Sequence, residues 1–192
     1  MARSPTPDPQ WPESVADAQV TLVRLAAVLE RYQSALYGFV RGIVGDAEQA
    51  CDLVQDTYYE ACRAARRGAP PFANASATET ETDVRRWLFR VAYNRAISAL
   101  RHRKVIQWLP LEHVRLLISF EDGVAEGEDM RSALATLTPA DAACLSLIVV
   151  YDFTAAEVGA ILGASPQAVA KRFSRAKQRL RDAYLVQHPP LE

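Results

Sequence analysis

Six cationic side chains and no acidic ones lie between residues 163 and 181, in the stretch GASPQAVAKRFSRAKQRLR. Apolar residues recur in it at every third or fourth position, which is typical of an amphipathic helix. Arginine and lysine on an exposed helix face bind nucleic-acid phosphates, and polar side chains near the start of such a helix reach base edges in the major groove. These residues therefore suggest binding to a polyanion.

A helical wheel divides this stretch into two sides, at 100° per residue. Its apolar residues fall within about 60° of one another and would dock on neighbouring helices: Val169, Phe173, Ala176 and Leu180. The adjacent side carries long cationic and amide groups. We predict that its early residues read bases and its later ones hold phosphates: Ser165, Gln167, Lys171 and Arg172, then Arg175, Lys177 and Arg179.

A second basic stretch, residues 83–104, has seven basic and one acidic side chain, while the whole chain has a net charge of only −1. Positive charge is thus concentrated in two segments about 80 residues apart rather than scattered. Two basic helices of this kind favour two contact points on a nucleic acid. The hypothesis requires the cations of 85–103 and 171–179 to face solvent instead of pairing with carboxylates.

The elements that would carry these residues are almost all helices. Apolar spacing predicts a helix over about 15–44, a second helix that starts at the N-cap Asp46, and a third that begins near Val84. We expect the arginines of this third helix, from Arg85 to Arg103, to be exposed. Between the last two helices, residues 67–82 contain proline, glycine and a Ser/Thr/Asn cluster, and are predicted to form a loop.

The C-terminal part contains a predicted helix-turn-helix. Thr138 and Thr154 each begin a helix with an acid three residues later, and Gly163 ends the second of these helices. Ser165 then caps the basic helix, with Pro166 at its first position. Two helices joined by a turn of three residues, GAS, are the pattern of that motif.

The predicted fold is therefore all-α, with two small helical domains joined by a flexible linker. Its predicted divisions are a disordered tail at 1–14, an N-terminal domain at 15–104, an acidic linker at 105–128 and a C-terminal domain at 129–187.

The basic stripes and their neighbours together resemble a bacterial extracytoplasmic-function sigma factor of the sigma-70 superfamily. The resemblance rests on DLVQD at 52–56, WLFRVAYN at 87–94, and the helix-turn-helix segment at 162–180. Their order and spacing cover about three quarters of the chain. Such a factor binds core RNA polymerase and directs promoter recognition and transcription initiation.

The resemblance assigns roles to matching positions. The second helix would dock on core polymerase through Asp52, Gln55 and Asp56. The third helix would open and read the −10 promoter element through Asn94, Arg95, Arg101 and Arg103. The basic C-terminal helix would read the −35 element through Ser165, Gln167, Lys171, Arg172, Arg175 and Arg179. Many members are held inactive by an anti-sigma protein, and no residue here identifies one.

Two other functions fit parts of the sequence less well. A free-standing helix-turn-helix regulator, which binds operator DNA without polymerase, is the main alternative. An enzyme is disfavoured, because the three histidines are scattered and no phosphate loop, nucleophile motif or metal-spaced cluster is present. We expect no cofactor, no membrane insertion and a cytoplasmic location. The three cysteines are predicted to be small buried residues.

Overall fold

The computed structural model describes residues 15–69, 71–72, 81–107, 133–134 and 136–187. These residues form six helices and no strands: α1 (Val15–Val44), α2 (Ala47–Arg66), α3 (Glu81–Gln107), α5 (Pro139–Val149), α6 (Ala155–Leu162) and α7 (Pro166–Gln187). The all-α prediction is confirmed. The predicted tail and residues 108–128 of the predicted linker lie outside the described residues, and α3 extends three residues past the predicted domain end.

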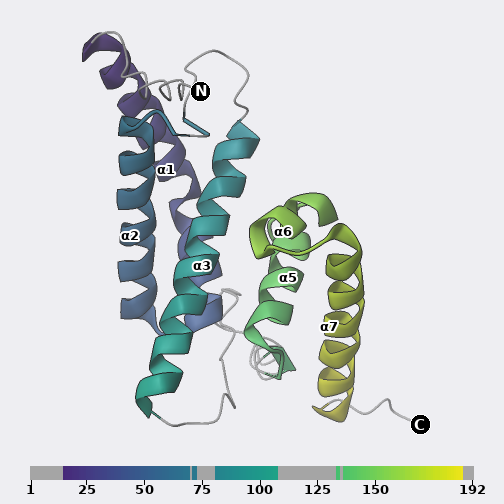
Figure 1. Ribbon diagram of the computed structural model, residues 1–192. Coiled ribbons are helices and arrows are strands. Elements are labelled where there is room, and N and C mark those ends of the chain that lie inside the picture. The colour runs from purple at the N-terminus through teal and green to yellow at the C-terminus, as the bar shows by residue number, and fades with distance from the viewer. Residues whose placement is uncertain (1–14, 70, 73–80, 108–132, 135, 188–192) are drawn as a thin grey trace, which may run out of the picture.

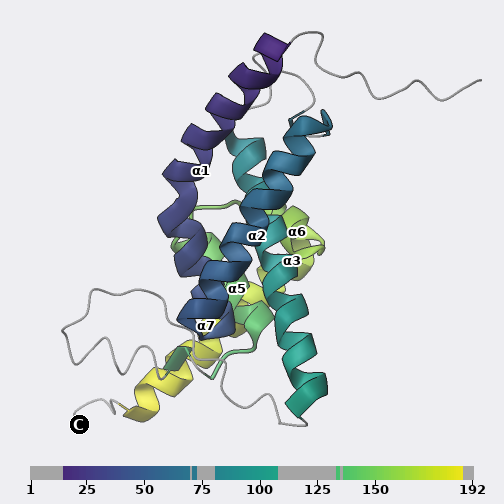
Figure 2. The same ribbon diagram turned by 90° about the vertical axis from the view of Figure 1, so that its left-hand side faces the viewer.

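Helices α1, α2 and α3 run side by side as an up-down-up bundle (Figures 1 and 2). The turn between α1 and α2 is short because Gly45 adopts a left-handed conformation, with φ of 77°, that ends α1. Asp46 then caps α2, and its carboxylate accepts a hydrogen bond of 2.7 Å from the Gln49 amide. These local features confirm the predicted boundary and set α2 antiparallel to α1.

The second group of helices is capped as the sequence predicts. Thr138 accepts a hydrogen bond from the Asp141 amide at the start of α5. Thr154 and Glu157 form a reciprocal capping box at the start of α6. Gly163 ends α6 with φ of 67°, and Ser165 accepts a hydrogen bond from the Ala168 amide at the start of α7. Helices α6 and α7 thus form the predicted helix-turn-helix.

Gly159 lets the turn of this motif close. A Cβ atom there would lie 2.6 Å from the Ala164 carbonyl oxygen, closer than two such atoms can approach. We expect Gly159→Ala to lower the free energy of unfolding by about 1–3 kcal/mol, because the clash is with backbone. Chemical denaturation of the full chain measures this. Ala160→Ser, at the exposed neighbouring position, is the control, and equal stabilities for the two variants would contradict the prediction.

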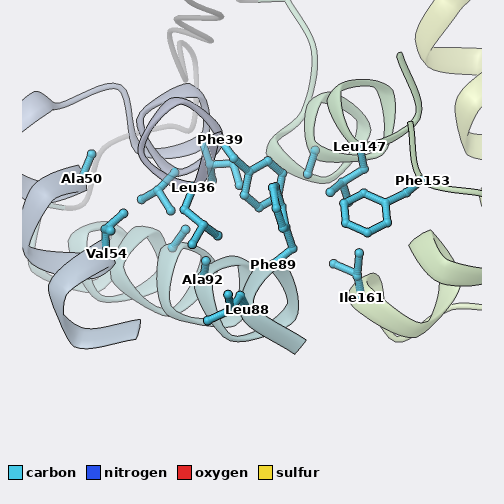
Figure 3. Close-up of a cluster of buried hydrophobic side chains, with 14 of the residues drawn as sticks. Leu36, Phe39, Ala50, Val54, Leu88, Phe89, Ala92, Leu147, Phe153 and Ile161 are labelled. Carbon is cyan, nitrogen blue, oxygen red and sulfur yellow. The ribbon is translucent and has the colours of Figure 1, made fainter. Parts of the chain in front are cut away.

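A single apolar core connects the two groups of helices. Phe89 of α3 is the largest fully buried side chain in the described part of the chain. The centroid of its ring lies 5.2 Å from that of Phe39 of α1, 5.0 Å from that of Tyr151 and 5.1 Å from that of Phe153. Figure 3 shows Phe39 of α1 and Phe89 of α3 between Ala50 and Val54 of α2 on one side and Leu147, Phe153 and Ile161 on the other. A smaller cluster around Leu134, Leu137, Ala142, Leu145 and Ala176 lies between α5 and α7.

The contact between the two groups differs from the sequence prediction of domains held apart by a tether. Arg85 lies at the polar centre of this contact, although the sequence predicts that its side chain is exposed. The Arg85 guanidinium donates to the Tyr151 carbonyl oxygen and lies 4.1 Å from the centre of the Phe153 ring. The physical reason is that residues 151–153, in the turn between α5 and α6, present an aromatic ring and a free carbonyl to one side of α3. The long Arg85 side chain reaches both groups: it donates a hydrogen bond to the carbonyl oxygen and places its positive charge over the ring.

Candidate nucleic-acid interface

The first turns of α7 present most of the predicted DNA-contacting residues to solvent, including three of the four predicted base readers. Ser165, Gln167, Lys171 and Arg175 are exposed. Val169 and Ala176 are fully buried on the opposite side, so the helical wheel placed the two sides of α7 correctly. Among the described residues, Lys171 and Arg175 form no ion pair. They are therefore available to a polyanion.

Two other predicted DNA contacts on α7 are engaged within the protein. Arg179 donates through Nη1 to Oδ2 of Asp141 at 2.8 Å, and Arg172 Nε lies 3.6 Å from Oδ1 of the same carboxylate. Asp141 belongs to α5, and its side chain is only 11% exposed. The expectation that the cations of 171–179 all face solvent unpaired is thus wrong for these two.

The polar side chains of α3 also include some that are exposed and some that are paired within the protein. Arg90, Asn94 and Arg101 are exposed, and so is Arg103, which also has a partner within the chain. Arg86 is half-buried and pairs with Asp83 at 2.5 Å. Trp87 is half-buried, with its ring edge-on to Phe72, which agrees with a packing role rather than a stacking surface. The outward polar face of α3 therefore lies mainly in its C-terminal half.

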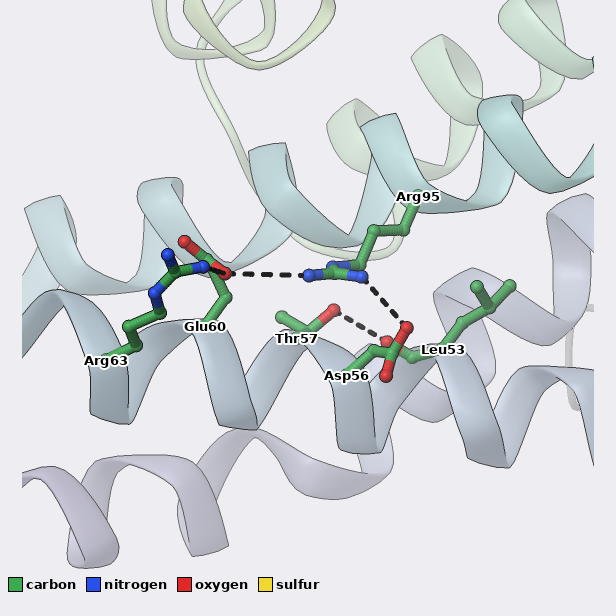
Figure 4. Close-up of polar contacts among 6 residues, drawn as sticks. All are labelled: Leu53, Asp56, Thr57, Glu60, Arg63 and Arg95. Atoms are coloured by element: carbon green, nitrogen blue, oxygen red, sulfur yellow. Dashed lines mark hydrogen bonds and ion pairs between the residues drawn. The ribbon is translucent and has the colours of Figure 1, made fainter.

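Arg95 connects two of the predicted sites. Its guanidinium lies between α3 and α2, where Nη1 donates to Asp56 at 2.8 Å and Nη2 lies 3.7 Å from Glu60 (Figure 4). Glu60 also approaches Arg63 at 3.7 Å. A predicted −10 contact is thus paired with a predicted polymerase contact. Both pairs are partly solvated, so each contributes less than about 1 kcal/mol to stability.

The acidic face of α2 is open to solvent. Asp52, Gln55 and Asp56 are all exposed, and Asp56 keeps 59% of its side chain accessible despite its pairing with Arg95. Tyr59 lies on the same side of the helix, four residues after Gln55, and is 69% exposed. This face therefore offers carboxylates, an amide and one aromatic ring to a partner.

The cysteines follow the sequence prediction only in part. Cys144 is buried, and burial raises the pKa of its thiol to about 11, so it is protonated and unreactive at neutral pH. Cys62 is half-buried and Cys51 is exposed, because the wheel position of Cys51 falls on the outer side of α2. Across the described ranges, histidine, cysteine and carboxylate side chains nowhere gather in threes as a metal site would require.

Comparisons with known families explain why two basic helices and a helix-turn-helix occur together. A family model described as Sigma-70 region 2 matches residues 28–105, which include α2 and most of α1 and α3. A second model, described as Sigma-70, region 4, matches residues 127–180, which include the helix-turn-helix. The chain belongs to the sigma-70 family. The two matches of this sigma-70 protein together cover about two thirds of its length and occur in the predicted order.

This sigma-70 protein is similar to an extracytoplasmic-function sigma factor. It is 26% identical over 171 residues to the ECF RNA polymerase sigma factor SigE of Mycolicibacterium smegmatis. The match covers 84% of this chain and 61% of SigE, so the chain spans less than two thirds of that relative.

Two solved structures share the fold of the sigma-70 protein. The sigma factor RpoE of Bartonella quintana, in complex with the anti-sigma factor NepR, superposes with a TM-score of 0.64 at 23% identity, over 87% of this chain and 96% of RpoE. CnrH, in complex with the cytosolic domain of CnrY, superposes with a TM-score of 0.61 at 21% identity, over 90% of this chain and 94% of CnrH. The overall arrangement of the helices is therefore one that RpoE and CnrH share.

Proposed function

We propose that this chain is a promoter-specificity subunit that binds core RNA polymerase and directs it to promoters for transcription initiation. The observation that carries the proposal is the pair of region 2 and region 4 matches over 28–105 and 127–180. The exposed acidic face of α2 supports docking to polymerase, and the exposed cations of α3 and α7 support binding to DNA. In this role the chain supplies recognition and no catalytic chemistry of its own.

We assign the roles of its residues as follows. Core polymerase would contact the acidic face of α2, at Asp52, Gln55 and Asp56. The −10 element would be held by the C-terminal half of α3, with Asn94 on a base edge and Arg95, Arg101 and Arg103 on phosphates. The start of α7 would enter the major groove of the −35 element. The proposed domain division remains 15–104 and 129–187.

The alternative, an operator-binding regulator that works without polymerase, is not favoured. A helix-turn-helix regulator would account for the match at 127–180 but not for the match to region 2 at 28–105. Within the described ranges, none of the helices combines the length and apolar character needed to cross a bilayer. A cytoplasmic location is part of the proposal, since the polymerase it would serve is there.

Transcription in vitro tests the proposal. Purified core polymerase, a library of promoter sequences and this chain are expected to give transcripts that start at a defined subset of the library. Core polymerase alone, and core with the Asp52→Arg, Asp56→Arg variant, are the controls. Start sites that are no more selective with the chain than without it would contradict the proposed function.

An inhibitory protein partner of the anti-sigma class is part of the proposal, because RpoE and CnrH were both solved with proteins bound. A cavity of about 230 Å³ between α1 and α5, lined in part by Tyr37, Phe39 and Tyr151, offers an opening that a partner side chain would fill. Proteins that co-purify with the chain from its own cells are added to the transcription assay. The expected partner lowers transcription with this chain and leaves another sigma factor unaffected; no such selective inhibition would contradict it.

A further inference from the structure

We infer that Asp141 is a positioning residue for the recognition helix: it holds Arg172 and Arg179 against α5, and thereby leaves Gln167, Lys171 and Arg175 as the side chains that face DNA. The inference rests on the proposed function and deepens it, because it narrows the set of residues that read the −35 element.

Asp141 is an unusual residue for its surroundings. Helix α5 is otherwise apolar or small, and Ala142, Ala143, Cys144, Leu145 and Leu147 beside it are buried. A carboxylate that is 11% exposed there loses most of its hydration, which is costly unless cations and donors replace the water. Both carboxylate oxygens receive such a partner, since Oδ2 accepts from Arg179 and Oδ1 lies close to Arg172.

The two arginines are seven residues apart, which is two turns and about 10.5 Å along α7. Both project from the same azimuth of that helix, so a single carboxylate between them fixes the rotation of α7 about its own axis as well as its position on α5. A slip by one residue would turn the helix by about 100° and separate both cations from Asp141. The pair of contacts therefore sets which side chains face outward.

The contacts of Asp141 determine which cations of α7 are free to bind DNA. Arg172 is half-buried, and Arg179 forms an ion pair with the Asp141 carboxylate. Gln167, Lys171 and Arg175 are instead exposed on the adjacent side of α7. Removing the charge of Asp141 would free two cations next to Gln167, Lys171 and Arg175. It would also remove the contacts that fix the rotation of α7 about its own axis. Phosphate binding would then gain contacts that carry no sequence information, while base reading would become less selective.

The test uses holoenzyme made from the full chain and core polymerase. Its readout is −35 selectivity, defined as the transcript ratio between a template with the best −35 sequence and one with that sequence scrambled, both with the same −10 element. We expect Asp141→Asn to lower this ratio about tenfold, while preference among −10 variants stays unchanged. Asp182→Asn is the matched control, because it removes one negative charge from α7 at an exposed carboxylate whose hydrogen-bond partner is Gln178.

Arg179→Gln is a second variant that breaks the same contact from the other side. It tests the inference even if Asp141→Asn lowers the free energy of unfolding. We expect it to reduce −35 selectivity by a similar factor, and the double variant to be no worse than the single variants by more than about twofold, because the residues act through one contact. Asp141→Glu, which keeps the charge, is expected to recover part of the selectivity.

Three results would overturn the inference. A folded Asp141→Asn variant within twofold of the wild-type ratio would do so, as would a double variant whose loss is the product of the single losses. Equal loss of −10 and −35 preference would indicate general unfolding and would also contradict a positioning role. Failure of the wild-type holoenzyme to start transcripts selectively would instead refute the proposed function, and the two failures are therefore distinguishable.

Discussion

Replacing Phe89 by alanine is expected to lower the free energy of unfolding by about 3–5 kcal/mol. Phe89 is fully buried, and its ring packs on Phe39 of α1 and on two aromatic rings from the α5–α6 turn. Truncation would leave a cavity bounded by three rings from two elements, which cannot all move inward to fill it. The loss would weaken the α1–α3 bundle and its contact with the second group of helices at the same time.

Chemical denaturation of the full chain, followed by circular dichroism, measures this loss. Tyr59→Ala is the matched control: it also removes an aromatic ring, but from a side chain that is 69% exposed on α2, and it is expected to change stability by less than about 0.5 kcal/mol. A Phe89→Ala variant that loses less than about 1 kcal/mol would show that the shared core contributes little.

The double variant Asp52→Arg, Asp56→Arg is expected to reduce affinity for core polymerase at least about a hundredfold. Both carboxylates are exposed, so the reversal changes the charge of the α2 face by four units without disturbing the buried core. It also breaks the contact between Asp56 and Arg95, which costs less than about 1 kcal/mol because the pair is partly solvated. The fold should therefore survive while docking fails.

Direct binding of labelled chain to core polymerase measures the effect, with circular dichroism as the check on folding. Arg95→Gln separates the two consequences of the Asp56 change, since it breaks the same ion pair and leaves the acidic face intact. We expect near wild-type affinity for core polymerase from Arg95→Gln. An unchanged affinity in the double aspartate variant would remove Asp52 and Asp56 from the proposed docking face.

The helix boundaries could be predicted from the sequence because they depend on contacts between near neighbours. Asp46, Thr138 and Thr154 each cap a helix through an amide three residues later, and Gly163 ends α6 through its own φ. Such contacts are independent of the rest of the chain. The apolar side of α7 was likewise visible, since a helical wheel needs only the spacing of its residues.

The contact between the two helix groups could not be predicted in this way. A wheel of α3 shows which residues share a side, but not that residues 151–153 will cover that side and turn Arg85 inward. The ion pairs of Arg172 and Arg179 were missed for the same reason, because their carboxylate lies more than 30 residues away in the chain. One signal was available: a single acid in the apolar run of α5 requires a cation from elsewhere in the fold.

The aromatic contact around Phe89 has a consequence for any DNA that this chain would span. Promoter sites named −10 and −35 are about 25 base pairs apart, which is about 85 Å along straight duplex DNA at about 3.4 Å per pair. Helix α3 is about 40 Å long, and α6 packs directly against it. Because α7 also packs against α6, the two proposed DNA-binding helices are held closer together than the two sites. Strengthening the junction between the helix groups should consequently weaken promoter engagement, and loosening it should let the chain bind promoters more readily.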